Sequence, residues 1–587
     1  MKGFVVASSS LLTLAACACV PDYPESLLWD TTILQDPAIT AAFEEIQRNL
    51  SSLYINTTRD GLSFAVVHAS SPNPVYTFNN GLLKFNETDV DATEADTVTS
   101  DSIFRIMSVS KNIAMLSALV VGNHENAALT LDARLRELLP SFQLPPLDWN
   151  SGGSEITLRM LASHTAGIPR ESYSTAFNMV LATGKADAAT IGAAWTAASA
   201  EEVIQAIGKE RLMFAPGQRA AYSNAGISLL GSGVAEHYND LNNSTLSWSQ
   251  VVTEHILSPI NMTHSFFGPV PQHLFNDISV PGGDNWAELI IGSGYDAAAG
   301  MWSSATDLSR YLHDIWLQPE PTLITTFQRR QALKPVYTLS DGKQQVGPGW
   351  EIQVLTLATS TNETSEPTKQ YSIFGKSGDG GGWHSWIDLI PNLGYGIVVL
   401  SQRSSIADFA SIAPTQIRDV VHEILAPAFA EAYAARLGER FAGIYTAGQD
   451  TGIIIDQVAL GSSYPATYAK VEVEDQILYV RELLVNGTSA LEAVDKLSWT
   501  ADSQPRYFST PAGVVLEPSE GSGEAEEFGE GAQIWRMIFP GLETCNWFDF
   551  DGYKDVNAWP LSKIVFVEQD GKVNLHYPPF DIVVTRN

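Results

Sequence analysis

The spacing of hydrophobic positions predicts helices and strands along the first part of the chain. Residues 41–50 have helical periodicity, and residues 64–67 and 75–78 are short apolar runs separated by a turn rich in serine and proline. These runs predict a helix followed by a strand pair. Residues 113–121 are apolar nearly all round and end at Gly122, which is typical of a helix buried inside a large domain.

Further along, helical and strand-like runs continue to alternate. Residues 158–169 predict a helix that ends in a turn, and residues 227–234 predict a second buried helix. Residues 386–390 and 395–400, separated by a Pro-Asn-Leu-Gly turn, predict a hairpin. The first part of the chain therefore mixes helices with strands.

Beyond about residue 435 the pattern changes to short strand-like runs. Strands are expected at 452–455, 477–480, 564–567 and 581–585, and an acidic loop over 517–531 interrupts them. This region contains no catalytic grouping of residues. We therefore expect it to stabilise the chain or to cover a site, rather than to catalyse.

The length and the charge narrow the function classes. A chain of 587 residues is too long for one hydrophobic core, and 45% hydrophobic with 17% charged residues is typical of globular proteins. The net charge of −32 repels phosphate backbones and anionic membranes, so nucleic-acid binding is not expected. After the first residues, no apolar run approaches the ~20 residues that a membrane span needs.

The first residues have the pattern of a secretory leader. Lys2 supplies a positive charge, residues 4–14 are apolar, and Ala-Cys-Ala at 16–18 is a small-residue cleavage site. We expect a signal peptide over residues 1–18 and a secreted protein; the alternative is a bacterial lipoprotein anchored at Cys17. Asn-x-Ser/Thr sequons favour the eukaryotic secretory route. The candidates for glycosylation are Asn49, Asn56, Asn86, Asn242, Asn243, Asn261, Asn362 and Asn486.

The cysteines leave two arrangements open. Cleavage after Ala18 would leave Cys19 and Cys545, which could pair in an oxidising compartment, whereas cleavage after Cys19 would leave Cys545 alone. No His/Cys cluster has the spacing of zinc ligands. We expect no metal and no other cofactor.

Ser108 and Lys111 are the first candidates for catalysis. They stand three residues apart where the apolar run of 113–121 begins, so a helix would place them on one face at its N-terminus. Free backbone N–H groups and the helix dipole favour developing negative charge there. A second Ser-x-x-Lys at 340–343 contains Asp-Gly and has no apolar helix behind it, which indicates a polar turn.

The second candidate pair is Tyr222 and Asn224. They follow a Pro-Gly turn and precede the apolar run of 227–234. An extended backbone would put both side chains on one side. Another Tyr-x-Asn at 54–56 lies inside a sequon and lacks this context.

Lys376, Ser377 and Gly378 form the third motif, at the end of a strand-like run and before further glycines. Glycines let a substrate backbone approach closely. A Lys-Ser/Thr-Gly triplet is expected only ~0.2 times by chance in such a chain, so this motif is the most specific of the three. The hairpin that follows it predicts that the motif lies at the edge of a sheet.

In this order and context, the three motifs resemble those of the serine β-lactamase and penicillin-binding protein superfamily. The tyrosine of the second motif resembles the class C β-lactamase and D,D-peptidase branch, with its related esterases. Supporting segments match at 159–169, 214–222, 299–308 and 347–350, and the resemblance covers about residues 40–430.

The resemblance implies an α+β fold with two domains. An antiparallel sheet flanked by helices would lie beside a helical subdomain, with the site between them, in a catalytic domain over residues 19–434. Residues 435–587 look like the β-rich, lipocalin-like domain that is appended to many relatives.

By the same resemblance, Ser108 attacks a carbonyl and forms an acyl-enzyme. Tyr222 is a poor base at its ordinary pKa of ~10 unless Lys111 and Lys376 stabilise its phenolate. Tyr222 would then take the proton of Ser108, or Lys111 would itself be the base. The backbone N–H groups of Ser108 and Asp379 would hold the oxyanion. The substrate-binding residues would be Asn224, Ser377, Gly378 and Asp379.

Asp379 departs from the family pattern, in which the residue after Lys-Ser-Gly is small and neutral. A carboxylate there should repel the carboxylate of β-lactams and D-Ala-D-Ala peptides, unless it points away or pairs with Lys376. We therefore expect a neutral ester, amide or lactone as substrate. Trp383 and His384 either line the pocket or pack elsewhere, and His164 is expected to be a hydrogen-bonded structural histidine.

Three function classes stay open. The first is a secreted serine hydrolase acting on a small-molecule or peptide-like substrate, and the second is an acyltransferase or hydrolase of secondary metabolism. The third is a catalytically silent binding protein. An α/β-hydrolase is disfavoured because no Gly-x-Ser-x-Gly elbow is present.

Overall fold

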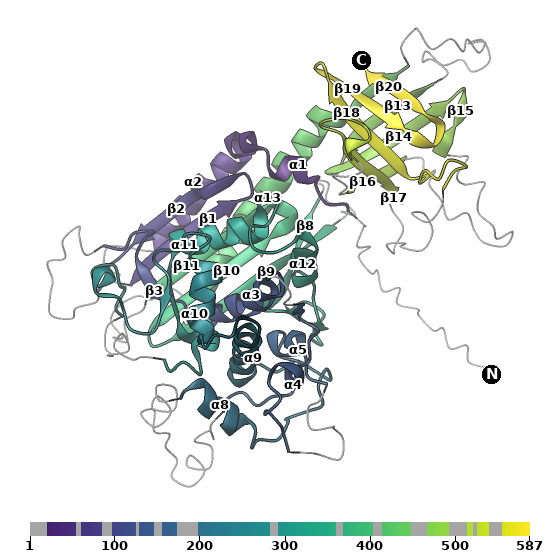
Figure 1. Cartoon of the computed structure of the whole chain (residues 1–587). Coiled ribbons are helices and arrows are strands. Elements are labelled where there is room, and N and C mark those ends of the chain that lie inside the picture. The colour runs from purple at the N-terminus through teal and green to yellow at the C-terminus, as the bar shows by residue number, and fades with distance from the viewer. Residues whose placement is uncertain are drawn as a thin grey trace, which may run out of the picture. The chain divides into compact units, whose positions relative to one another are not determined.

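The chain forms two compact units in the computed structural model (Figure 1). The larger unit comprises Trp29–Leu355 and Ser372–Ala426, and the smaller comprises Met1–Leu28, Thr356–Tyr371 and Pro427–Asn587. The structure describes residues 20–53, 60–84, 97–124, 128–145, 155–172, 198–281, 291–359, 368–402, 414–447, 467–491, 513–519, 525–538 and 554–587. Outside these ranges lie the expected leader, the three cysteines, the Tyr-x-Asn at 54–56, the strand at 452–455, and the sequon residues Asn56, Asn86 and Asn362.

An antiparallel sheet of eight strands organises the larger unit, in the order β2-β1-β11-β10-β9-β8-β7-β6. The strands are β1 (Gly61–His68), β2 (Ser71–Asn80), β6 (Tyr337–Thr338), β7 (Gln344–Gly347), β8 (Trp350–Ala358), β9 (Thr368–Gly380), β10 (Trp383–Ile390) and β11 (Tyr395–Gln402). The expected strand pair and hairpin are confirmed. The turn after β1 is shorter than expected, because β2 begins at Ser71. Pro72 and Pro74 are tolerated in β2 because it is an edge strand.

Helices cover both faces of this sheet. One face is covered by α2 (Pro37–Leu53) and α13 (Pro414–Phe441), and the other is covered by α11 (Ala305–Tyr311). From α2, the ring of Phe43 stacks on Tyr76 of β2 with centroids 5.2 Å apart. From α13, Nδ1 of His422 lies 2.9 Å from the hydroxyl oxygen of Tyr395. Because alternate residues of a strand face opposite sides, both faces of the central strands β1 and β11 are buried.

A second sheet, of three strands, contacts the segment that leads into the central helix. Its order is β3 (Ile103–Arg105), β5 (Met301–Ser304) and β4 (Phe266–Phe267). The guanidinium of Arg105 lies 4.2 Å from the ring centroid of Trp302, and the N–H of Ile106 donates to the carbonyl of Met301 at 3.1 Å. The central helix α3 (Ser110–Gly122) is buried except at its last residue, as its apolar pattern predicted.

A helical subdomain is built around α9 (Asn224–Asn242), which contacts α3 and the neighbouring short helices (Figure 1). The short helices that contact α9 are α4 (Leu135–Leu138), α5 (Leu158–Ala162), α8 (Ala200–Ile207) and α10 (Trp248–Val252). The described residues also form α1 (Glu25–Leu28) and α12 (Thr326–Ala332). None of the helices that the structure describes is both long and apolar enough to cross a membrane.

The smaller unit contains a closed antiparallel sheet of eight strands. Its order is β13-β12-β20-β19-β18-β17-β16-β14, and β14 pairs back with β13 while β15 extends the sheet beside β14. The strands are β12 (Gly443–Thr446), β13 (Tyr468–Glu474), β14 (Ile477–Val485), β15 (Thr488–Ser489), β16 (Val514–Ser519), β17 (Gln533–Ile538), β18 (Lys563–Gln569), β19 (Lys572–Tyr577) and β20 (Ile582–Arg586). The expected strands at 477–480, 564–567 and 581–585 fall in β14, β18 and β20. The expected fold class, an α+β domain with a β-rich C-terminal domain, is confirmed.

Three features differ from the sequence-based expectations. The Lys-Ser-Gly motif does not lie at a sheet edge, because β9 is flanked by both β8 and β10. The helix α13, of 28 residues, was not predicted; it contains Pro427, whose missing N–H weakens a helical pattern. The domain boundary expected at residue 434 lies within α13, whereas the two units divide between Ala426 and Pro427.

A buried ion pair between Arg418 and Asp388 links α13 to β10, with side chains 3% and 0% exposed. Arg418→Met should therefore lower the free energy of unfolding by about 3–5 kcal/mol, because it removes the permanent cation from the buried carboxylate of Asp388. This carboxylate is then left with His422 and Trp386. Urea denaturation followed by tryptophan fluorescence measures this loss. The control Arg48→Met removes a pair to Glu44 with side chains 68% and 70% exposed, for which we expect less than about 0.5 kcal/mol. Equal losses in the two variants would contradict the assignment.

Candidate active site

Ser108 lies in a 3-10 turn, η3 (Met107–Val109), between β3 and α3. The hydroxyl of Ser110 donates to the carbonyl of Met107 at 2.7 Å and ties this turn to the first residue of the helix. Met107 has a φ of 48°, a left-handed conformation that costs a non-glycine residue about 1–3 kcal/mol. The surrounding contacts thus hold Ser108 in a strained turn at the N-terminus of α3, where backbone N–H groups favour negative charge.

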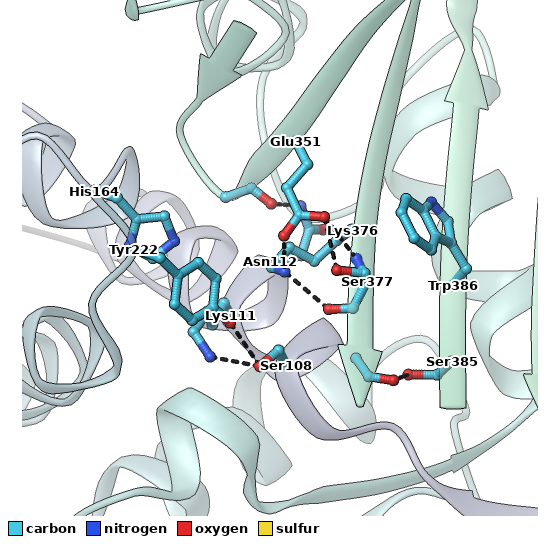
Figure 2. Close-up of polar contacts among 12 residues, drawn as sticks. Ser108, Lys111, Asn112, His164, Tyr222, Glu351, Lys376, Ser377, Ser385 and Trp386 are labelled. Atoms are coloured by element: carbon cyan, nitrogen blue, oxygen red, sulfur yellow. Dashed lines mark hydrogen bonds and ion pairs between the residues drawn. The ribbon is translucent and has the colours of Figure 1, made fainter. Parts of the chain in front are cut away.

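The side chain of Lys111 is completely buried. Its ammonium donates to Oγ of Ser108 at 2.8 Å (Figure 2) and to the carbonyl of Ala298 at 2.6 Å. Ala298 belongs to the π-helical segment η7 (Asp296–Gly300), which packs on α3. Burial lowers the pKa of Lys111 to about 8, although Tyr222 acts in the opposite direction. Lys111 can therefore exchange a proton near neutral pH.

The hydroxyl of Tyr222 lies 2.7 Å from Oγ of Ser108, next to the ammonium of Lys111 (Figure 2). The ammonium groups of Lys111 and Lys376 lie 4.8 and 5.3 Å from the centroid of the Tyr222 ring. Burial opposes ionisation of this phenol, but the two ammonium groups outweigh it and hold the pKa of Tyr222 below its ordinary value. Ser108 thus contacts two groups that are able to take its proton.

His164 packs on Tyr222, with the ring centroids 4.5 Å apart. Its carbonyl accepts from the N–H of Ala221 at 2.9 Å, and its Nδ1 accepts from the N–H of Ser223 at 3.1 Å. Burial and the nearby cations lower the pKa of His164 well below the usual range, so the ring is neutral. These contacts confirm the structural role that we expected, since His164 fixes the backbone on both sides of Tyr222.

Lys376 extends from β9 and forms a buried ion pair with Glu351 of β8 (Figure 2). The other carboxylate oxygen of Glu351 accepts from the hydroxyl of Ser377 at 2.8 Å and from its N–H at 3.2 Å. Burial alone would lower the pKa of Lys376, but Glu351 and Tyr222 raise it above its ordinary value. Burial also opposes the charge on Glu351, and Lys376 holds the pKa of this carboxyl below its ordinary value. The pair is therefore charged at neutral pH.

The sequence analysis did not identify Glu351, because a single carboxylate in a strand has no diagnostic spacing. The only signal was the Gly-Pro-Gly-Trp segment at 347–350, whose position the structure explains. The side chain of Asn112 in α3 donates to the carbonyl of Gly349 at 3.0 Å. Gly349 has a φ of 73°, and a Cβ there would lie 3.1 Å from Cβ of Met115. The start of β8 is thus fixed against α3, which brings Glu351 to Lys376.

Gly378 lets β9 pass close to the nucleophile. A Cβ there would lie 2.1 Å from the carbonyl oxygen of Ile106 and 3.0 Å from the amide nitrogen of Ser108. The hydroxyl of Ser385 in β10 donates to the same carbonyl of Ile106 at 2.6 Å. Only glycine fits at this position, so bare backbone of β9 lies beside Ser108.

Asp379 forms no ion pair with Lys376. Its Oδ1 lies 2.6 Å from Nδ1 of His384, which is its cross-strand partner on β10. The side chain of Asp379 is 66% exposed and that of His384 is 20% exposed. Trp383 is fully buried and donates from Nε1 to the carbonyl of Ser279 at 3.1 Å. Of the two residues whose place the sequence left open, Trp383 belongs to the core and His384 pairs with Asp379.

Asn224 is the first residue of α9 and is buried. Its Nδ2 donates to Oε1 of Glu171 at 2.7 Å. The preceding Ser223 accepts from the N–H of Gly226 at 2.8 Å and donates to the carbonyl of Pro169 at 2.6 Å, which joins the helix start to the segment before Glu171. Burial raises the pKa of Glu171, although the hydrogen bond from Asn224 lowers it. The sequence analysis did not identify Glu171, which has no spacing signal either.

The predicted catalytic residues meet in one place, and the predicted substrate-binding residues divide. Contacts join Ser108 directly to Lys111 and Tyr222, and Lys376 faces the ring of Tyr222 (Figure 2). Ser377 and Gly378 adjoin these residues. The side chain of Asn224 is instead hydrogen-bonded to Glu171, and that of Asp379 pairs with His384. Among the described residues, no group of three or more His, Cys, Asp and Glu side chains could hold a metal ion. The arrangement provides a hydroxyl nucleophile with two proton acceptors, which suits acyl transfer.

The second Ser-x-x-Lys motif takes no part in this site. It forms the turn between β6 and β7, where Oδ1 of Asp341 accepts from the N–H groups of Lys343 and Gln344, both at 3.0 Å. Gly342 has a φ of 70° in this turn. The expectation of a polar turn is confirmed.

Comparisons with known proteins identify the family of the chain. Beta-lactamase-like protein 2 of Dictyostelium discoideum is 24% identical over 336 residues, which cover 57% of this chain but only 55% of that protein. D-alanyl-D-alanine-carboxypeptidase/endopeptidase AmpH of Escherichia coli (strain K12) is 26% identical over 336 residues, covering 55% of this chain and 77% of that protein. The crystal structure of a β-lactamase/D-alanine carboxypeptidase from Yersinia pestis, complexed with citrate, covers 68% of this chain and 99% of its own at 19% identity and a TM-score of 0.47. The Beta-lactamase family model matches residues 49–422, more than half of the chain, and the chain therefore belongs to the β-lactamase family.

Proposed function

We propose that the protein is a serine hydrolase that cleaves an ester, amide or lactone through an acyl-enzyme on Ser108. One observation carries this proposal: Oγ of Ser108 lies 2.8 Å from the ammonium of Lys111 and 2.7 Å from the hydroxyl of Tyr222. Both partners have a pKa below the ordinary value of their group. An acyl transfer enzyme needs this activation, because a serine hydroxyl is a weak nucleophile at neutral pH.

Each step of acylation has a residue that is placed for it. As Ser108 attacks the carbonyl carbon, its proton passes to Tyr222 or to Lys111, and the same group returns it to the leaving group. The backbone N–H of Ser108 can donate to the oxyanion that forms in this step. The bare backbone of β9 at Gly378 lies beside this N–H, which supports an oxyanion site between the two. Water then attacks the acyl carbon and releases the acid. An acceptor other than water would make the same site an acyltransferase.

The charges of the site favour substrates without a carboxylate. Lys376 and Ser377 would be the natural binding groups for a substrate anion, but both already bind Glu351. The carboxylate of Asp379, two residues after Ser377 in β9, is exposed and pairs with His384, so Glu351 is the carboxylate that decides this preference. A carboxylate on the substrate would thus compete with Glu351 for these donors.

The expected reaction intermediate gives the first test. A p-nitrophenyl ester should add one acyl group to the protein, seen by intact-mass spectrometry after rapid quenching, and Ser108→Ala should abolish the adduct. The matched control Ser340→Ala, in the second Ser-x-x-Lys motif, should acylate normally. An adduct that persists in Ser108→Ala would refute the assignment. Nitrocefin, which carries a carboxylate, should react much more slowly, and its rapid turnover would refute the substrate preference alone.

The pH dependence of acylation tests the roles of the charges. The rate should rise as the pH increases through about 8, because Lys111 and Tyr222 together must lose a proton before either can accept one from Ser108. Lys376→Met removes a positive charge that lowers the pKa of both groups, so the rising limb should move to higher pH. Glu351→Gln removes the charge that keeps Lys376 protonated, so the limb should move in the same direction. Stopped-flow acylation measures both shifts, and a limb that moves to lower pH in Lys376→Met would contradict this account.

We further propose that the protein is secreted and carries N-linked glycans. The leader pattern and the sequons support this, and four of the sequon residues that the structure describes are exposed: Asn242, Asn243, Asn261 and Asn486. After expression through a eukaryotic secretory pathway, an N-glycosidase should lower the mass of the secreted protein. A mass that the glycosidase leaves unchanged would contradict glycosylation.

A further inference from the structure

Two hydrogen-bond acceptors beside Tyr222 are buried without a partner. The structure gives no hydrogen-bond partner to Oδ1 of Asn224 or to Oε2 of Glu171, and both atoms are shielded from solvent. Asn224 is 5% exposed, and the side chain of Glu171 is 9% exposed. Buried polar atoms in folded proteins are nearly always hydrogen-bonded, so two unpaired acceptors on neighbouring side chains suggest that a ligand supplies the donors.

The described residues around these acceptors do not supply a donor. The amide Nδ2 of Asn224 is already used on Oε1 of Glu171, at 2.7 Å. The nearest cation is Arg170, whose Nε lies 3.8 Å from the same Oε1, which is too far for a hydrogen bond. Its side chain is 65% exposed, and its guanidinium lies over the ring of Tyr222, 5.0 Å from the centroid. Among the residues that the structure describes, none donates to Oε2 of Glu171, so a bound group can supply this hydrogen bond.

The position of the two acceptors places that group near the reacting atoms. Asn224 is two residues from Tyr222, whose hydroxyl lies 2.7 Å from Oγ of Ser108. Glu171 lies within electrostatic reach of Lys111, the other partner of Ser108. A substrate bound at Ser108 would thus reach Glu171 and Asn224 with a short chain.

We propose that Oε2 of Glu171 and Oδ1 of Asn224 form a subsite for a protonated amine, so that the preferred substrates are aminoacyl esters or amides. This inference rests on the proposed hydrolase function and specifies its substrate class. An ammonium offers three N–H donors and no acceptor, and its charge matches the carboxylate. A neutral hydroxyl would satisfy the hydrogen bonds but add no charge beside Glu171, whose ion-pair partner Arg170 is mostly exposed, which makes the hydroxyl the weaker ligand.

The rest of the site agrees with a cationic substrate. Lys376 is neutralised by Glu351, and Asp379 lies further along the same strand. The chain as a whole has a net charge of −32 at pH 7, which attracts cations. The field of the whole chain therefore favours a cation over an anion.

Matched pairs of substrates test the subsite. The p-nitrophenyl esters of glycine, β-alanine and 4-aminobutyrate are compared with those of propanoate, butanoate and pentanoate, in which a methyl group replaces the ammonium. Each rate is corrected with Ser108→Ala as the blank. We expect at least one amino ester to have a kcat/KM about 10- to 100-fold above that of its neutral counterpart. Glu171→Gln should bring this ratio close to one, because the loss in kcat/KM falls mainly on the amino ester.

The controls separate the possible failures. Glu236→Gln removes an exposed carboxylate from the same helix as Asn224, and it should keep the wild-type ratio. A second measurement needs no variant: butylammonium should inhibit turnover of the neutral ester competitively, and butanol should not. A wild-type ratio near one at every chain length, a ratio that Glu171→Gln leaves unchanged, or equal inhibition by the two probes would overturn the subsite alone. If no ester acylates Ser108, the hydrolase function falls and this inference falls with it.

Discussion

The buried ammonium of Lys111 is the constraint on which the site depends. A charge without solvent contact costs several kcal/mol unless the protein surrounds it with acceptors. The carbonyl of Ala298 and the hydroxyl of Ser108 supply two of them, at 2.6 and 2.8 Å. The first acceptor requires the π-helical segment η7 to pack on α3, and the second requires the strained turn at Met107. The cost of burial is also what makes Lys111 useful, because it lowers the pKa of this amine to about 8.

Beyond Lys111, the charged groups of the site shift the pKa values of their neighbours. Tyr222 lies between the ammonium groups of Lys111 and Lys376, and both lower its pKa. Lys376 in turn has Glu351 on its other side, which keeps it protonated although it is buried. Lys376 can therefore act as a fixed positive charge, while Lys111 and Tyr222 exchange the proton of Ser108. The buried ion pair matters here for what it does to Tyr222, and not as a source of stability.

The sequence predicted the parts of the site that depend on local spacing. Ser108 and Lys111 could be found because one helix start sets their separation, and Tyr222 because a turn and a buried helix frame it. Glu351 and Glu171 could not be found this way, since each reaches the site through a contact between segments far apart in the chain. The same limit explains the wrong expectation that β9 lies at a sheet edge. Its neighbour β8 pairs with it in the sheet, and no local pattern in the sequence indicates this pairing. The fold class was predictable from alternating patterns and motif order, whereas α13 was hidden by Pro427.

Asp379 shows why a residue's chemistry must be assigned separately to its backbone and its side chain. The expectation that its carboxylate faces the substrate assumed that the side chain follows the backbone toward Ser108. Alternate residues of a strand point to opposite faces, and the neighbouring Gly378 is the one whose Cβ position meets the nucleophile turn. The side chain of Asp379 instead pairs across the strands with His384. Discrimination against carboxylates therefore depends more on Glu351, which lies partly exposed beside Lys376 and occupies the donors that a substrate anion would need.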